Sequence, residues 1–113
     1  MVIIEMTGAF LFVLLVLTLK RINGAQDQRI TNAMAIGFAL YGIAVTFRFS
    51  GIMNPAVGLA QPVYQHLVFK DVLRLGLIVM PIYCLAPLAG GALAGVFSKF
   101  NVRMHNKFDH VGY

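Results

Sequence analysis

The sequence predicts an all-α membrane protein with three transmembrane helices and one re-entrant half-helix. Of its 113 residues, 59% are hydrophobic and only 12% are charged, which is too little polar surface to cover a soluble globule of this size. The charges are clustered, so they leave uncharged stretches at residues 6–18, 30–47, 49–69 and 75–98. Because about 20 apolar residues are needed to cross a bilayer as a helix, we expect all four stretches to enter the membrane.

The first segment, about residues 2–19, is almost continuously Leu, Val, Phe and Ile. As a helix it is about 27 Å long, close to the thickness of the hydrocarbon layer. No basic residue precedes it, and it ends at Lys20-Arg21 without a small-residue cleavage site. These features indicate a permanent helix rather than a cleaved signal peptide. The polar connection at residues 20–29 is expected to face water.

Two further spanning helices are expected at about residues 31–47 and 75–97, and both are rich in Gly and Ala. Small residues allow the backbones of neighbouring helices to approach closely in a membrane. The glycines expected to mediate this helix packing are Gly37, Gly42, Gly91 and Gly95. We therefore predict a single membrane domain over residues 1–98, followed by a polar C-terminal tail over residues 99–113.

The segment at about residues 50–69 has a different character, because it is uncharged but rich in polar and helix-breaking residues. These are Ser50, Gly51, Asn54, Pro55, Gly58, Gln61, Pro62, Gln65 and His66. Such a composition is unfavourable for a span that faces lipid, whereas irregular backbone is tolerated where neighbouring helices or water shield it. We interpret this segment as re-entrant, meaning that it enters the membrane without crossing it.

The sequence Gly51-Ile-Met-Asn-Pro-Ala-Val-Gly-Leu-Ala60 resembles the aquaporin, or major intrinsic protein, family. Re-entrant half-helices of that family begin with Asn-Pro-Ala after a glycine turn, which matches Gly51 and the run Asn54-Pro55-Ala56. Flanking sequences extend the resemblance over nearly the whole chain. EMTGAFLFV from Glu5 resembles the acidic helix start of the family, AIGFAL at residues 35–40 resembles the helix before the motif, and YCLAPLAGG at residues 83–91 resembles the helix after it.

The resemblance implies half of a channel, because the family has two inverted halves, each with three helices and one half-helix. Charge indicates which half it resembles. The side that receives the 20–29 connection and the C-terminal tail carries a net charge of about +4, against about +2 for the other side. The positive-inside rule therefore places the C-terminus on the inner side, cytoplasmic or matrix, which is the topology of the second half. In one respect the chain departs from that half, since Val57 follows Ala56 where the family's second motif continues with its filter arginine.

Two residues of the motif region have both a structural and a functional interpretation. Asn54 followed by Pro55 is a typical helix N-cap, and the resemblance implies that the Asn54 amide also faces a pore where the helix dipole repels cations. Glu5 is either an interfacial carboxylate that reaches water or, as the resemblance implies, an acceptor that fixes the re-entrant backbone.

Several other classes of function are disfavoured. The net charge of +5 comes from Lys and Arg at segment ends and forms no basic patch, so nucleic acid is not an expected partner. Cys84 is the only cysteine and is expected to be a small buried hydrophobe, while His66 lacks companions at ligand spacing. We expect no metal and no cofactor. No nucleophile, acid-base pair or phosphate loop is present, so an enzyme is not expected.

Three hypotheses for function follow. The first is a structural or accessory subunit of a larger membrane complex, which keeps the half-channel fold while transport is lost. The alternative is a water or glycerol-like solute channel formed with a second half-channel. A third is a simple helical-hairpin protein in which Asn-Pro-Ala arose by chance. The expected partners are the lipid bilayer and either other membrane subunits or a second half-channel; the mitochondrial inner membrane is our hypothesis for the location.

Overall fold

The fold consists of helices joined by short connections. A computed structural model describes residues 1–23, 28–47, 52–69 and 73–109, with the side chains of 22–23, 73–77 and 108–109 excepted. The elements over these ranges are α1 (Val2–Asn23), α2 (Arg29–Thr46), α3 (Pro55–Val68) and α4 (Leu73–Asp109). The described residues contain no strand, which agrees with the predicted all-α class.

Three of these helices have the length and composition of membrane spans. The candidate stretches are Val2–Arg21 in α1, Arg29–Thr46 in α2 and Ile78–Lys107 in α4, of which the last includes charged residues from Lys99 onward. In contrast, α3 has 14 residues. At about 1.5 Å per residue it is about 21 Å long, which is shorter than a hydrocarbon layer of about 30 Å. The chain is therefore compatible with an integral membrane protein that has three spanning helices and one short helix.

The helices extend further than the apolar pattern predicts. α1 continues to Asn23 rather than residue 19, and α4 runs for 37 residues from Leu73 to Asp109 rather than ending at 97. Thus the tail expected from residue 99 is helical as far as Asp109. The physical reason is that the apolar pattern ends where the hydrocarbon ends, whereas Lys, Arg and Met remain good helix formers and no Gly or Pro interrupts residues 96–109. Residues 110–113 lie outside the described part.

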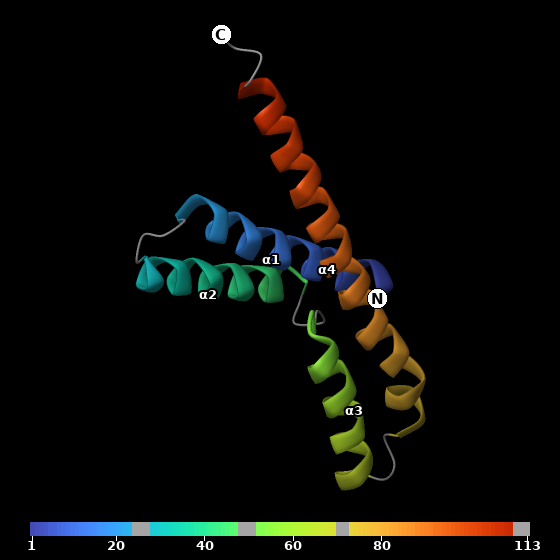
Figure 1. The fold of residues 1–113 in the computed structure, drawn as a ribbon. Coiled ribbons are helices and arrows are strands. Elements are labelled where there is room, and N and C mark those ends of the chain that lie inside the picture. The colour runs from blue at the N-terminus through green and yellow to red at the C-terminus, as the bar shows by residue number, and fades with distance from the viewer. Residues whose placement is uncertain (24–27, 48–51, 70–72, 110–113) are drawn as a thin grey trace.

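Figure 1 shows α4 as the longest element, crossed by α1 and accompanied along its first half by α3. α1 and α3 both pack against α4, and α2 packs against α1. Among the described residues α2 has no substantial contact with α3 or α4. The molecule is elongated, with extents of 67 × 27 × 22 Å. One side of α1 is thus covered by α4, and α2 lies on another side.

Small residues allow the close crossing of α1 and α4. Ala9 and Ala94 are 2% and 0% exposed, and Gly90 is packed so closely on the backbone of Met6 that an added Cβ would collide with the Met6 carbonyl oxygen. Further along, the ring of Phe10 meets that of Phe97 edge-on, with centroids 5.9 Å apart. Met6 of α1 contacts Gly90 of α4, and Phe10, later in α1, contacts Phe97, later in α4. The two helices therefore run in the same general direction.

α2 differs from the other helices because none of its residues is buried. Six of its large apolar side chains are exposed, and Ile30, Phe38 and Tyr41 are the most exposed, at 79%, 70% and 66%. The full exposed set on this helix is Ile30, Met34, Phe38, Leu40, Tyr41 and Val45. In a membrane these side chains contact lipid or another protein rather than water.

Candidate functional site

The candidate site is centred on Glu5, the most buried polar residue of the described chain, which is 1% exposed. Its carboxylate accepts two backbone hydrogen bonds from the segment that precedes α3. Oε1 accepts from the amide of Ile52 at 2.9 Å, and Oε2 accepts from the amide of Met53 at 2.8 Å. Charge-assisted hydrogen bonds of this kind are roughly twice as strong as neutral ones. A single side chain of α1 thus fixes a segment 47 and 48 residues away in the sequence.

The segment held by Glu5 has an unusual backbone at Met53. Met53 has a φ of 52°, which lies in the left-handed region that residues with a Cβ rarely adopt. Gly8, one turn after Glu5, faces the same residue, because a Cβ on Gly8 would lie 2.9 Å from Met53 Cγ and Sδ. α1 therefore contributes both the acceptor for this turn and the space for its side chain. Gly51, the expected turn glycine, lies outside the described residues.

Asn54 caps the N-terminus of α3. Its backbone is extended (φ −138°, ψ 114°), and its Oδ1 accepts a hydrogen bond from the amide of Ala56 at 2.9 Å. Pro55 is the first helical residue, a position where proline loses no helical hydrogen bond. The side chains of Asn54, Ala56 and Val57 are exposed. The motif thus combines a satisfied helix cap with an open surface.

α4 fixes the position of this helix start. A Cβ on Gly58 would lie 2.6 Å from the carbonyl oxygen of Tyr83 and 2.8 Å from its Cβ, so α3 and α4 approach closely only because residue 58 is glycine. One turn earlier, the Pro55 carbonyl accepts from Cys84 Sγ at 3.6 Å. Cys84, expected to be a buried hydrophobe, is half-buried and touches the motif. α1 therefore holds the turn before the motif, and α4 holds the helix after it.

The glycines expected to mediate helix packing do not make the closest approaches within the chain. A Cβ on Gly91 would be 3.7 Å from Val13, an ordinary contact. Gly37, Gly42 and Gly95 have nothing within 4 Å of their virtual Cβ among the described residues, so contact with another chain stays a prediction for them. The close approaches are made at Gly8, Gly58 and Gly90 instead. The sequence did not single out these three, because small-residue content alone does not distinguish them from Gly37.

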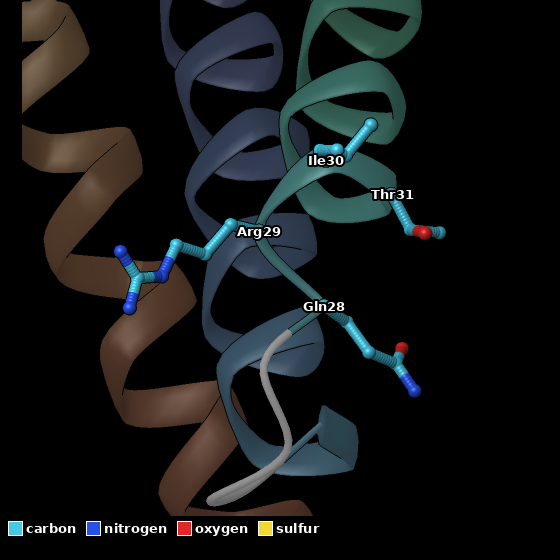
Figure 2. A pocket seen from close by; sticks show the side chains of 4 residues that line it. All are labelled: Gln28, Arg29, Ile30 and Thr31. Atoms are coloured by element: carbon cyan, nitrogen blue, oxygen red, sulfur yellow. The ribbon is translucent and has the colours of Figure 1, made fainter.

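Two hollows among the described residues are lined by neither Glu5 nor Asn54. At the start of α2, a hollow of about 430 Å³ is lined by Gln28, Arg29, Ile30 and Thr31. Figure 2 shows Arg29 directed away from Gln28 and Thr31, so these side chains do not converge on a common point. An apolar groove of about 310 Å³ between α1 and α4 is lined by Val2, Met6, Pro81, Ile82, Leu85, Ala86 and Ala89.

Metal chemistry finds no support in the described ranges. His66 is exposed on α3, and no group of three or more His, Cys, Asp or Glu side chains there is arranged to hold an ion.

Comparison with known proteins adds no further assignment. The chain matches no protein-family model, no curated protein and no solved structure. The aquaporin resemblance therefore stays a prediction from the sequence, based on Glu5, Asn54-Pro55-Ala56 and the flanking segments.

Proposed function

We propose that this chain is an aquaporin-like half unit, and that it acts as a structural or accessory subunit of a larger membrane complex without transport activity of its own. The unit comprises the three spanning helices and α3 as a re-entrant half-helix. The proposal has two parts: that α3 begins inside the membrane, and that another protein covers the surface where it begins.

The depth at which α3 begins supports the first part. Pro55 contacts Cys84, which is eleven residues after the start of α4 at Leu73. Eleven residues of helix correspond to about 16 Å, or about half the thickness of the hydrocarbon layer. From this depth α3 runs beside the first half of α4 toward the start of that helix (Figure 1). Backbone at this depth must be satisfied by protein or water, and Glu5 and Asn54 satisfy it at Ile52, Met53 and Ala56.

The exposure of Asn54 carries the second part. An exposed amide at membrane depth is costly in lipid, because hydrocarbon offers no hydrogen-bond partner. The exposed surface around it needs either another protein or a water-filled passage. Val57, which is 45% exposed, stands where the family's second motif has its filter arginine, so this position offers an apolar contact rather than a cation. An apolar valine in place of arginine favours packing against a partner protein over selection of a solute.

The alternative function is a water or small neutral solute channel completed by a second half-channel. One observation favours it: the N-terminus of α3 keeps its Asn54 cap and its Pro55 start, so the helix dipole and the amide are arranged as a cation-repelling pore requires. The same exposed surface would then line a water-filled passage between two half units.

Site-specific photocrosslinking in the native membrane tests the subunit proposal. A photoreactive residue at Val57 should give a discrete protein adduct, because a partner covers this surface. The matched control is Leu93 on α4, which is 50% exposed and lies away from the motif; it should give mainly lipid adducts. Only lipid adducts at both positions, together with a chain that purifies alone, would contradict the proposal.

Swelling of proteoliposomes distinguishes the alternative. Chain reconstituted alone or with the crosslinked partner should show no excess water or glycerol permeability if it is an accessory subunit. Excess permeability that disappears in Asn54→Ala would instead establish the channel. Fractionation of cells that express a tagged chain tests the mitochondrial inner membrane as its location.

A further inference from the structure

The C-terminal half of α4 carries a surface that the half-channel fold does not use. Three cations, Lys99, Arg103 and Lys107, follow one another at intervals of four residues, and all three are exposed. Four residues advance a helix by just over one turn, so the three cations form one stripe on it. No Asp or Glu occurs between residues 99 and 107. We call Lys99, Arg103 and Lys107 the basic stripe.

The basic stripe lies on the face of α4 turned away from α1. Residues that contact α1 or are buried beside it follow the spacing Gly90, Ala94, Phe97. The opposite face follows steps of three and four through exposed positions, namely Leu85, Leu88, Ala92, Val96, Lys99, Arg103 and Lys107. Along this one face, every residue up to Val96 is apolar and every residue from Lys99 onward is cationic.

The point of change coincides with the end of the uncharged stretch of α4. Residues 75–98 carry no charge, and 24 residues of helix measure about 36 Å, enough to cross a hydrocarbon layer of about 30 Å with some tilt. Lys99 then emerges at the headgroups. The headgroup region adds about 5–8 Å on each side, and the stripe extends over about 12 Å of helix axis. Flexible Lys and Arg stems allow all three cations to reach this layer.

Apolar side chains beside the stripe favour lipid as the occupant. Val96 and Phe100 are 67% and 61% exposed, and Met104 is 38% exposed. They flank the cations at the level where acyl chains meet headgroups. Exposed Lys20 and Arg21 lie in the last turn of α1, which runs in the same sense as α4, so they add positive charge to the same leaflet.

We propose that the basic stripe binds the phosphate headgroups of anionic phospholipids in the leaflet where α4 ends, with the acyl chains lying along Val96 and Phe100. The site selects lipids by charge: each headgroup phosphate meets Lys or Arg, and no described carboxylate opposes it. This function is independent of whether α3 forms part of a pore or a packing surface.

Fluorescence quenching by brominated lipids tests the proposal on the full chain. The chain contains no tryptophan, so Val96→Trp places a single reporter beside the stripe. In vesicles of phosphatidylcholine with phosphatidylglycerol, brominated phosphatidylglycerol should quench this reporter more strongly than brominated phosphatidylcholine. The preference should fall in high salt, because salt screens exposed charges. Phe38→Trp, exposed on α2 and nine residues from the nearest charge in sequence, is the control reporter and should show no preference.

Neutralisation of the stripe should remove the preference. Each of Lys99→Gln, Arg103→Gln and Lys107→Gln should weaken the selection of phosphatidylglycerol by up to about fivefold, since a cation near an anionic surface contributes about 1 kcal/mol. The triple variant Lys99→Arg, Arg103→Lys, Lys107→Arg keeps the charges and should retain the preference for phosphatidylglycerol. This control shows whether the neutralised variants lose lipid binding or lose their fold. Equal quenching by both lipids in the unneutralised chain at low salt would overturn the proposal. If that chain instead binds a poly-glutamate peptide in neutral vesicles, the stripe recognises an acidic protein segment and not lipid.

Discussion

The two faces of α1 show how differently helices of similar composition pack. α4 crosses one face so closely that Gly90 lies against the backbone of Met6, whereas α2 lies along another face without burying any residue of its own. Both α2 and α4 are rich in Gly and Ala. The difference is that Gly90 faces the backbone of α1, while an added Cβ on Gly37 or Gly42 would have nothing within 4 Å among the described residues. Small residues permit a close approach, but only Gly90 of these three glycines is placed against another backbone.

The largest loss of stability is expected on substitution of Glu5, the α1 residue that holds the turn before α3. Glu5→Ala removes the acceptor of two partly buried backbone amides, and hydrogen bonds to charged groups contribute about 1.5–3 kcal/mol each. We expect a loss of about 3–5 kcal/mol in unfolding free energy, measured by denaturant titration in mixed micelles. Glu5→Gln keeps the side-chain length and one acceptor oxygen, so it should lose about half as much. Equal stability of Glu5→Ala and the unmodified chain would show that these two bonds do not hold the turn.

A matched pair of glycine substitutions tests the comparison directly. Gly90→Ala places a methyl group against the Met6 carbonyl, which is backbone and has little room to move, so we expect a loss of about 1–3 kcal/mol. Gly37→Ala meets no described residue within 4 Å and improves helix propensity, so it should be neutral or stabilising by up to about 1 kcal/mol. Thermal unfolding in nanodiscs measures both.

The outcome for Gly37→Ala depends on the assembly. If Gly37→Ala destabilises the native complex but not the isolated chain, α2 packs against a partner through this glycine. If Gly90→Ala is as harmless as Gly37→Ala, the two faces of α1 do not differ in the way described above.

The smallest effect is expected at the helix cap. Asn54→Ala leaves the amide of Ala56 without its acceptor and should reduce stability by about 1 kcal/mol. Asn54→Asp keeps a capping oxygen and should preserve most of the stability, although it replaces the neutral amide by a carboxylate. A loss much larger than about 2 kcal/mol for Asn54→Ala would mean that the side chain has a packing role in addition to capping.

The sequence by itself determined the class of the protein and its local chemistry. Uncharged stretches of membrane length predict helices within a bilayer, because lipid excludes charge and requires internal backbone hydrogen bonds. Asn54 followed by Pro55 predicts a helix start, because a side-chain acceptor and a residue without an amide suit that position. The end of α4 was not predictable in this way, since the apolar pattern marks the edge of the hydrocarbon rather than the edge of the helix.

Only the tertiary structure decided which residues meet. Glu5 is an isolated carboxylate in the sequence, and its role as acceptor for Ile52 and Met53 depends on bringing together residues 47 and 48 positions apart. Likewise, Gly37 and Gly90 both lie in segments rich in Gly and Ala, so the sequence does not distinguish them. They differ because α1 crosses the face of α4 that carries Gly90. Local patterns specify helices and their caps through neighbouring residues, whereas close approach depends on the distances between segments that are remote in the chain.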